Sequence, residues 1–219
     1  MIVDERTITY INSLEQGDSE FLRMIAKEAA ASFVPIIRKE TGSLLKTLVE
    51  MKRPRRILEV GTATGYSALL MSEHMPEGST ITTIEKYEKR IPIARENFRR
   101  GGKEDVITLL PGDAAEILKS LSGPYDFIFM DAAKGQYIHF LPEVLRLMPV
   151  GGVLVSDNVL QDGDLIESRF AVTRRNRTIH ARMREYLYTI KHMEELETAV
   201  IPIGDGVTIS VKIKEQLQR

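Results

Sequence analysis

Short apolar runs alternate with longer amphipathic segments from residue 56 onward. Strands are expected in the apolar runs, and helices are expected between them, where apolar residues recur every three or four positions. This alternation predicts an α/β fold with a doubly wound, mostly parallel sheet. The predicted strands are 56–60, 80–85, 106–110, 126–131 and 152–157, and the predicted helices lie near 65–75, 88–100, 114–121 and 138–148.

The two ends of the chain depart from this alternation. Residues 1–54 show helical spacing and predict two or three helices. Near the other end, extended runs at 198–203 and 207–213 flank a Gly-Asp-Gly turn, whose glycines admit positive φ, so an antiparallel hairpin is expected. With no repeat and no clear linker, we expect residues 1–219 to form one domain, with the N-terminal helices packed on a 55–219 core.

Composition narrows the function classes. The formal net charge of -1 gives no global reason to expect nucleic acid or membrane as a partner. The lack of cysteine excludes disulfides, zinc-thiolate sites and thiol nucleophiles. The charged N-terminus does not resemble a signal peptide, and no apolar run approaches the roughly 18 residues of a membrane span. We therefore expect a cytoplasmic protein with no membrane partner.

Glycines and acidic residues lie where the first three predicted strands end. Gly61 and Gly65 stand at a sharp turn into a helix, where a missing Cβ lets a ligand approach the backbone. Their G-x-x-x-G spacing matches neither the dinucleotide motif nor the phosphate-binding loop. Glu85 can accept hydrogen bonds from ribose hydroxyls, and Asp113 can meet an adenine amino group. These strand ends predict an adenosine site that requires no phosphate.

Each of these residues also has a structural interpretation. The glycines can form a turn without a ligand, and Glu85 can be a solvated strand end. Asp113 can cap a helix, with Glu116 completing a capping box. Glu59 lies on an otherwise apolar strand, so its carboxylate needs a partner, either a ligand or the backbone. Together these residues lie at successive carboxyl ends of one sheet, which is where open α/β sheets bind ligands.

Oxygen donors end the fourth and fifth predicted strands. Asp131, Asp157 and Asn158 offer two carboxylates and a carboxamide, which suit a hard divalent cation such as Mg²⁺. Lys134 lies one helical turn after Asp131. A nearby dication disfavours the ammonium form, so this lysine suits a general base toward a hydroxyl. The alternatives are that Asp131 caps the next helix, that Asp157 and Asn158 begin a turn, and that Lys134 is a surface lysine.

These motifs resemble the cation-dependent, class I S-adenosylmethionine O-methyltransferases, which include catechol and caffeoyl-coenzyme A O-methyltransferases. The resemblance extends over nearly the whole chain and is carried by "LEVGTATGYS", "YDFIFMDAAKGQY", "GGVLVSDNVL" and "IPIGDGVTIS". It implies a Rossmann-like fold, S-adenosylmethionine as cofactor, a divalent cation, expected to be Mg²⁺, and a homodimer. Within the family, the chain looks most similar to bacterial tRNA methyltransferases that convert wobble 5-hydroxyuridine to 5-methoxyuridine.

The resemblance also implies roles for particular residues. Asp131, Asp157 and Asn158 would ligate the metal, and Asp131 would also lie near the methionine ammonium group. Lys134 matches the catalytic lysine of the family, and the cation would lower the pKa of the acceptor hydroxyl. The residues that would surround the cofactor are Ile37, Glu59, Gly61, Ser67, Glu85, Asp113, Ala114 and Asp131.

A cluster of five arginines within eleven residues bears on the acceptor. Arginines beside a site suit RNA phosphates, so tRNA is the expected partner. No aromatic-rich platform accompanies them, although Tyr137, Tyr186 and Tyr188 are candidates for stacking. Alternatively, they form a solvated helix face paired with Glu185 and Glu194, and the acceptor is a small catechol or caffeoyl-type phenol. A non-catalytic adenosine-binding module is a third hypothesis, but it has no use for the metal ligands. The arginines are Arg174, Arg175, Arg177, Arg182 and Arg184.

Overall fold

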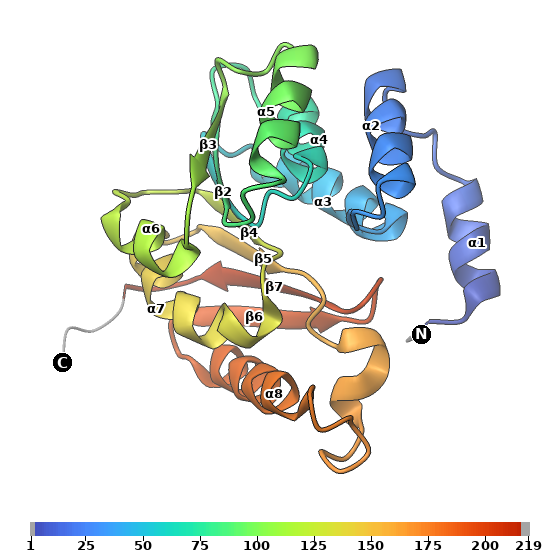
Figure 1. The fold of residues 1–219 in the computed structure, drawn as a ribbon. Helices are drawn as coiled ribbons and strands as arrows, with labels where there is room; N and C mark the ends of the chain where they lie inside the picture. The colour runs from blue at the N-terminus through green and yellow to red at the C-terminus, as the bar shows by residue number, and fades with distance from the viewer. Residues whose placement is uncertain (1–2, 216–219) are drawn as a thin grey trace.

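The computed structural model describes residues 3–215, which form a sheet covered by helices on both faces (Figure 1). None of the helices in this range is both long enough and apolar enough to cross a membrane. With η marking a 3-10 helix, the elements are α1 (Glu5–Ser13), α2 (Glu20–Ala31), α3 (Lys39–Lys52), β1 (Arg56–Val60), α4 (Tyr66–His74), β2 (Thr80–Glu85), α5 (Ile91–Arg100), β3 (Ile107–Pro111), α6 (Ala114–Ser120), β4 (Phe127–Met130), η1 (Lys134–Gln136), α7 (Tyr137–Leu147), β5 (Val153–Ser156), η2 (Gln161–Ile166), α8 (Arg177–His192), β6 (Leu196–Ile201) and β7 (Val207–Lys212).

The strands follow the order β3-β2-β1-β4-β5-β7-β6 in the sheet. The first five are parallel, whereas β7 runs antiparallel to both β5 and β6. The predicted doubly wound α/β fold with a C-terminal antiparallel hairpin is therefore confirmed. The strand order reverses between β1 and β4, and this switch point is where open α/β sheets bind ligands.

The central strand β4 is apolar throughout because both of its faces are buried. Phe127 and Phe129 face the core shared with α2, α3, α4 and α5, while Ile128 and Met130 face the core shared with α6, α7 and α8. Figure 1 shows these two groups of helices on opposite sides of the sheet. A strand buried on both faces shows no alternation of polar and apolar residues, which explains the continuous apolar run in the sequence.

Strand β6 differs from its predicted range of 198–203. It begins at Leu196 and ends at Ile201. The earlier start follows from burial, because Leu196 and Thr198 point inward while Glu197 points outward, as an edge strand requires. The ladder ends before Pro202, which has no N–H to donate.

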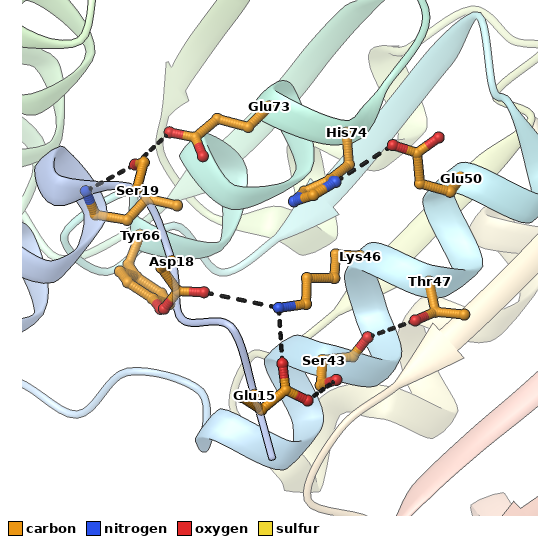
Figure 2. A network of polar contacts seen from close by, with 11 residues as sticks. Glu15, Asp18, Ser19, Ser43, Lys46, Thr47, Glu50, Tyr66, Glu73 and His74 are labelled. Carbon is orange, nitrogen blue, oxygen red and sulfur yellow. Dashed lines mark hydrogen bonds and ion pairs between the residues drawn. The ribbon is translucent and has the colours of Figure 1, made fainter. Parts of the chain in front are cut away.

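The N-terminal helices are attached to α4 by apolar and polar contacts. Leu22 and Ile25 of α2 and Leu45 of α3 belong to the core that includes residues of α4. The segment between α1 and α2 is held by the polar network of Figure 2, in which Lys46 Nζ lies 3.0 Å from a Glu15 carboxylate oxygen. Helix α1 itself has no buried residue. The assignment of a single domain stays a prediction.

Candidate functional site

A cavity of about 1060 Å³ opens at the carboxyl ends of the five parallel strands. Residues 35–38, which precede α3, and Asp205 of the β6–β7 turn complete its wall. It therefore lies at the predicted ligand-binding edge of the sheet. Glu59 and Ser67 do not line it. The candidate site residues in its wall are Ile37, Gly61, Glu85, Asp113, Ala114, Asp131, Lys134, Asp157 and Asn158.

Gly61 is required by the close approach of two strand ends. Its φ of +106° is one that side chains rarely allow, and a Cβ there would lie 2.1 Å from the Asp131 carbonyl oxygen. Gly65 also has a positive φ. A Cβ at this position would lie 2.5 Å from a carbon atom of the Phe98 ring, which is too close. Gly61 therefore shapes the cavity wall, whereas Gly65 is explained by packing of the turn against α5.

Glu59 is completely buried beneath the cavity wall. Ser67 Oγ donates to one carboxylate oxygen at 2.5 Å, and the Thr83 hydroxyl donates to the other. Burial raises the pKa of Glu59 to about 8, although both hydroxyls oppose this shift. The partners of the Glu59 carboxylate are therefore two side-chain hydroxyls. The sequence had suggested a ligand or the backbone instead. The roles of Glu59 and Ser67 around the cofactor stay predictions.

Glu85 is held rigidly at the end of β2. One carboxylate oxygen accepts the Ala63 N–H at 2.7 Å, and the other accepts the Tyr87 N–H, also at 2.7 Å. Because the side chain is buried, the interpretation as a solvated strand end is wrong. Each oxygen retains a second lone pair, so the carboxylate can still accept a hydrogen bond from a ligand in the cavity.

Asp113 caps α6, as the structural interpretation of the sequence allowed. Its carboxylate accepts the Ala115 N–H at 2.9 Å and lies 2.6 Å from Lys86 Nζ. The Lys86 hydrogen bond is the main reason that the pKa of Asp113 is lowered. Glu116 hydrogen-bonds to Lys119 instead of completing a capping box. Asp113 also lines the cavity, so capping does not exclude contact with a ligand.

Asp157, which is buried, and Asp131, which is half-buried, bring two carboxylates to the same cavity. Burial raises the pKa of Asp131, and nearby Lys134 opposes this shift. Burial, and then the charge of Asp131, raise the pKa of Asp157 to about 7. Within residues 3–215, no lysine, arginine or histidine nitrogen lies within 4.0 Å of either carboxylate.

This donor set fits a hard divalent cation. Two carboxylates without a close cationic partner, with the neighbouring Asn158 carboxamide, supply only oxygen ligands. A dication would offset the repulsion between the carboxylates. Asp131 does not cap the next helix, because the residue at the η1 N-cap is Ala133 and makes no side-chain capping bond. That structural alternative is therefore wrong.

Lys134 is not an isolated surface residue. It begins η1, its side chain is half-buried, and it lines the cavity with Asp131 and Asp157. The next residue, Gly135, accepts a hydrogen bond from the Arg182 side chain at 3.1 Å, so α8 packs directly against the turn that carries the lysine.

The arginine cluster lies on and just before α8, beside this turn. Arg174, Arg175 and Arg184 are exposed. In the described range, none of the five arginines forms an ion pair within 4.0 Å, and Glu194 pairs with Lys214 at 2.7 Å. The predicted pairing with Glu185 and Glu194 is thus wrong in the described residues, and the exposed Arg174, Arg175 and Arg184 have no carboxylate within 4.0 Å.

Two of the suggested stacking tyrosines do not face a ligand. Tyr137 and Tyr186 are completely buried, whereas Tyr188 is exposed and stacks on His192. Buried tyrosines cannot stack on an RNA base, so that suggestion is wrong for both of them. The sequence reasoning instead missed Arg38, which lines the cavity and forms ion pairs with Asp162 and Asp205. The Gly-Asp-Gly motif indicated a turn there but no role for its Asp.

Comparison with known proteins identifies the family. The family model described as O-methyltransferase matches residues 12–213. A catechol O-methyltransferase from Niastella koreensis is 31% identical over 72% of this chain and 74% of its own length. A caffeoyl-CoA O-methyltransferase from Populus kitakamiensis is 29% identical over 91% of this chain and 89% of its own length.

Solved structures agree with this family. An O-methyltransferase from Bacillus cereus in complex with SAH superposes with a TM-score of 0.83 at 26% identity, covering 93% of this chain and 96% of that one. The chain therefore belongs to the O-methyltransferase family, which confirms its resemblance to S-adenosylmethionine-dependent O-methyltransferases.

Proposed function

We propose that this enzyme methylates an acidic hydroxyl group in the described cavity, using S-adenosylmethionine and a divalent cation. The observation that carries the proposal is that one cavity joins two sets of residues. Gly61, Glu85 and Asp113 line its adenosine side, and Asp131 and Asp157 line its metal side. The SAH in the Bacillus cereus relative supports the choice of cofactor.

On the cofactor side, each residue binds through a group that the fold has already oriented. The Glu85 carboxylate accepts the ribose hydroxyls, and its two backbone hydrogen bonds keep it from rotating away. Asp113 accepts from the adenine amino group, while Ile37 and Ala114 provide apolar wall. S-adenosylmethionine supplies an electrophilic methyl group, whose bond to sulfur breaks as the acceptor oxygen forms its bond to carbon.

On the metal side, Asp131, Asp157 and Asn158 hold a divalent cation, most consistent with Mg²⁺ because all three donors are oxygens. A cation held by these residues would lower the pKa of the acceptor hydroxyl. Lys134 accepts the hydroxyl proton as general base, and Asp131 also contacts the methionine ammonium group. Both reactants are held in one cavity, so correct positioning supplies part of the rate enhancement.

The first candidate acceptor is wobble 5-hydroxyuridine in tRNA, giving 5-methoxyuridine. The support is the cluster of arginines without ion pairs next to the lysine turn, since RNA phosphates attract such charges. The second candidate is a small catechol or caffeoyl-type phenol, favoured by the catechol and caffeoyl-CoA O-methyltransferases among the relatives. The cytoplasmic location and the homodimer stay predictions.

Labelled S-adenosylmethionine distinguishes the acceptors. The enzyme is incubated with tRNA that contains 5-hydroxyuridine, with the same tRNA carrying unmodified uridine, and with catechol. We expect label in the hydroxylated tRNA and none in the unmodified tRNA, which has no hydroxyl at that position. Label in catechol but in neither tRNA would contradict the first candidate and support the second. Labelling of no acceptor would contradict both candidates.

Charge variants test the arginine cluster in the same assay. The Arg174→Ala, Arg175→Ala double variant should raise KM for tRNA about tenfold, because two phosphate-binding charges are lost. A matched control removes two exposed arginines, Arg23 and Arg95, from the α2 and α5 surfaces. An equal rise in KM for both double variants would show a nonspecific effect of net charge.

A further inference from the structure

The hydroxyl of Tyr137 lies between the ends of the two strands that carry the proposed metal ligands. Its oxygen is 3.0 Å from the Met130 carbonyl oxygen and 3.1 Å from the Asp157 carbonyl oxygen. Met130 directly precedes Asp131, and both carbonyls belong to backbone from which a metal ligand projects. One hydroxyl therefore contacts both strand ends next to the cavity.

This contact extends the connection between β4 and β5 beyond their backbone ladder. The Asp157 N–H donates to the Met130 carbonyl at 3.0 Å. The Tyr137 hydroxyl contacts the same Met130 carbonyl and, in addition, the carbonyl of Asp157. Since a hydroxyl has one proton, it donates to either carbonyl or is shared between them.

Tyr137 is itself held firmly in place. It is completely buried, and its ring meets the Tyr186 ring edge-on, with centroids 5.5 Å apart and an interplanar angle of 79°. The Tyr186 hydroxyl lies 2.6 Å from Ser156 Oγ, which anchors the second ring to β5. The hydroxyl has a single proton to donate, and the two carbonyl oxygens within hydrogen-bond distance of it are both acceptors.

Tyr137 also connects the strand ends to the turn that bears Lys134. Its backbone N–H donates to the Lys134 carbonyl at the end of η1, and its side chain reaches back to the strands. A single residue thus contacts the backbone of all three segments that supply Asp131, Lys134 and Asp157. Groups that orient metal ligands in this way commonly change metal affinity when they are removed.

We infer that Tyr137 is a positioning residue, which sets the separation of the Asp131 and Asp157 carboxylates for a divalent cation. The inference rests on the proposed metal centre. It adds a function for a buried tyrosine that touches neither the cofactor nor the acceptor.

The test is the affinity of Mn²⁺ for wild type and for Tyr137→Phe, measured by titration calorimetry and by the Mn²⁺ EPR signal without acceptor. Phenylalanine keeps the buried ring and removes only the hydroxyl. We expect about tenfold weaker binding and an altered EPR signal. Turnover should recover when Mg²⁺ is raised to saturation, because the ligands themselves remain.

Tyr186→Phe is the matched control, since it removes an equally buried hydroxyl that contacts Ser156 instead of the two carbonyls. It should lower thermal stability and weaken Mn²⁺ binding less than Tyr137→Phe does. Unchanged Mn²⁺ affinity in Tyr137→Phe, an equal loss in Tyr186→Phe, or a Tyr137→Phe chain that fails to fold would each overturn the positioning role. Wild type that binds no Mn²⁺ would instead overturn the proposed metal centre, and the inference with it.

Discussion

Lys134 combines three properties that suit a general base. Its side chain is half-buried, it lines the cavity with Asp131 and Asp157, and its turn is braced by a hydrogen bond from Arg182. No ion pair within 4.0 Å ties its amine to either carboxylate in the described residues. No carboxylate therefore holds the Lys134 nitrogen away from a hydroxyl group in the cavity.

Replacing Lys134 with alanine should separate binding from chemistry. We expect S-adenosylmethionine affinity to change less than about twofold, while methyl transfer falls by roughly 10²- to 10⁴-fold because the base is lost. Calorimetry and single-turnover labelling measure the two quantities. Lys119→Ala, on the exposed side of α6, is the control and should retain activity. Full activity in Lys134→Ala would refute the catalytic role.

Glu59 should make stability depend on pH. In the folded protein its pKa is raised to about 8 by burial, above the ordinary value of 4.5. Between these values the unfolded chain loses a proton that the folded chain keeps, so Glu59 lowers stability as pH rises through this window. Glu59→Gln cannot ionise. We therefore compare the free energy of unfolding of Glu59→Gln with that of wild type. The value for the variant minus the value for wild type should increase by at least about 1 kcal/mol between pH 5 and pH 8.

Urea denaturation at both pH values, in the presence of chelator, measures this difference. Glu104→Gln is a suitable control, because Glu104 is exposed and its replacement should show little dependence on pH. A relative stability of Glu59→Gln that stays constant or falls between the two pH values would contradict a neutral, buried Glu59.

Among the elements, the first three strands were the easiest to predict from sequence. β1 and β2 match their predicted bounds, and β3 lies one residue later than predicted. Their short apolar runs are bounded by glycine or charged residues, so the pattern has few alternatives. The hydrophobic pattern did not predict α8, in which mostly polar residues separate the buried His180, Met183, Tyr186 and Ile190.

The hydrophobic pattern located site residues where they end a strand or directly follow it. Gly61, Glu85 and Asp131 end or follow strands that the pattern identifies, and all three line the cavity. Arg38 and the Tyr137 hydroxyl depend on contacts between distant segments. Tyr137 meets Asp157 from twenty residues away, and hydrophobic periodicity carries no information about such a contact.

Helix α1 should depend on the polar network of Figure 2, because it has no buried residue of its own. Lys46 donates to Glu15 at 3.0 Å and lies 4.0 Å from Asp18. Lys46→Ala should weaken the attachment of α1 by about 1 kcal/mol, which corresponds to roughly fivefold faster hydrogen exchange of its amides. Hydrogen exchange with mass spectrometry measures this change.

Lys27→Ala is the control for this prediction. Lys27 is exposed on α2, and no ion pair within 4.0 Å involves it in the part of the chain described. Its replacement should leave exchange in α1 unchanged. Equal exchange of α1 in Lys46→Ala and wild type would show that the network does not hold the helix.

At the scale of the whole molecule, the sheet brings segments from nearly the entire chain to one cavity. Residues 35–38, the ends of five parallel strands and the β6–β7 turn all contribute to its wall. The arginine cluster lies on and just before α8, and its Arg182 contacts the turn that carries Lys134, although the net charge of the chain is only -1. Cofactor, cation and acceptor would therefore meet where the strand order reverses, at the edge of the sheet that such folds use for ligands.

The most direct test of metal-dependent methyl transfer is turnover of S-adenosylmethionine with and without EDTA, on whichever acceptor the enzyme labels. We predict that excess EDTA lowers turnover at least about 100-fold and that excess Mg²⁺ restores it, because a cation held by Asp131, Asp157 and Asn158 would lower the pKa of the acceptor hydroxyl. Cofactor affinity, measured in parallel, should change little. Turnover that excess EDTA leaves unchanged would contradict the metal centre formed by Asp131, Asp157 and Asn158.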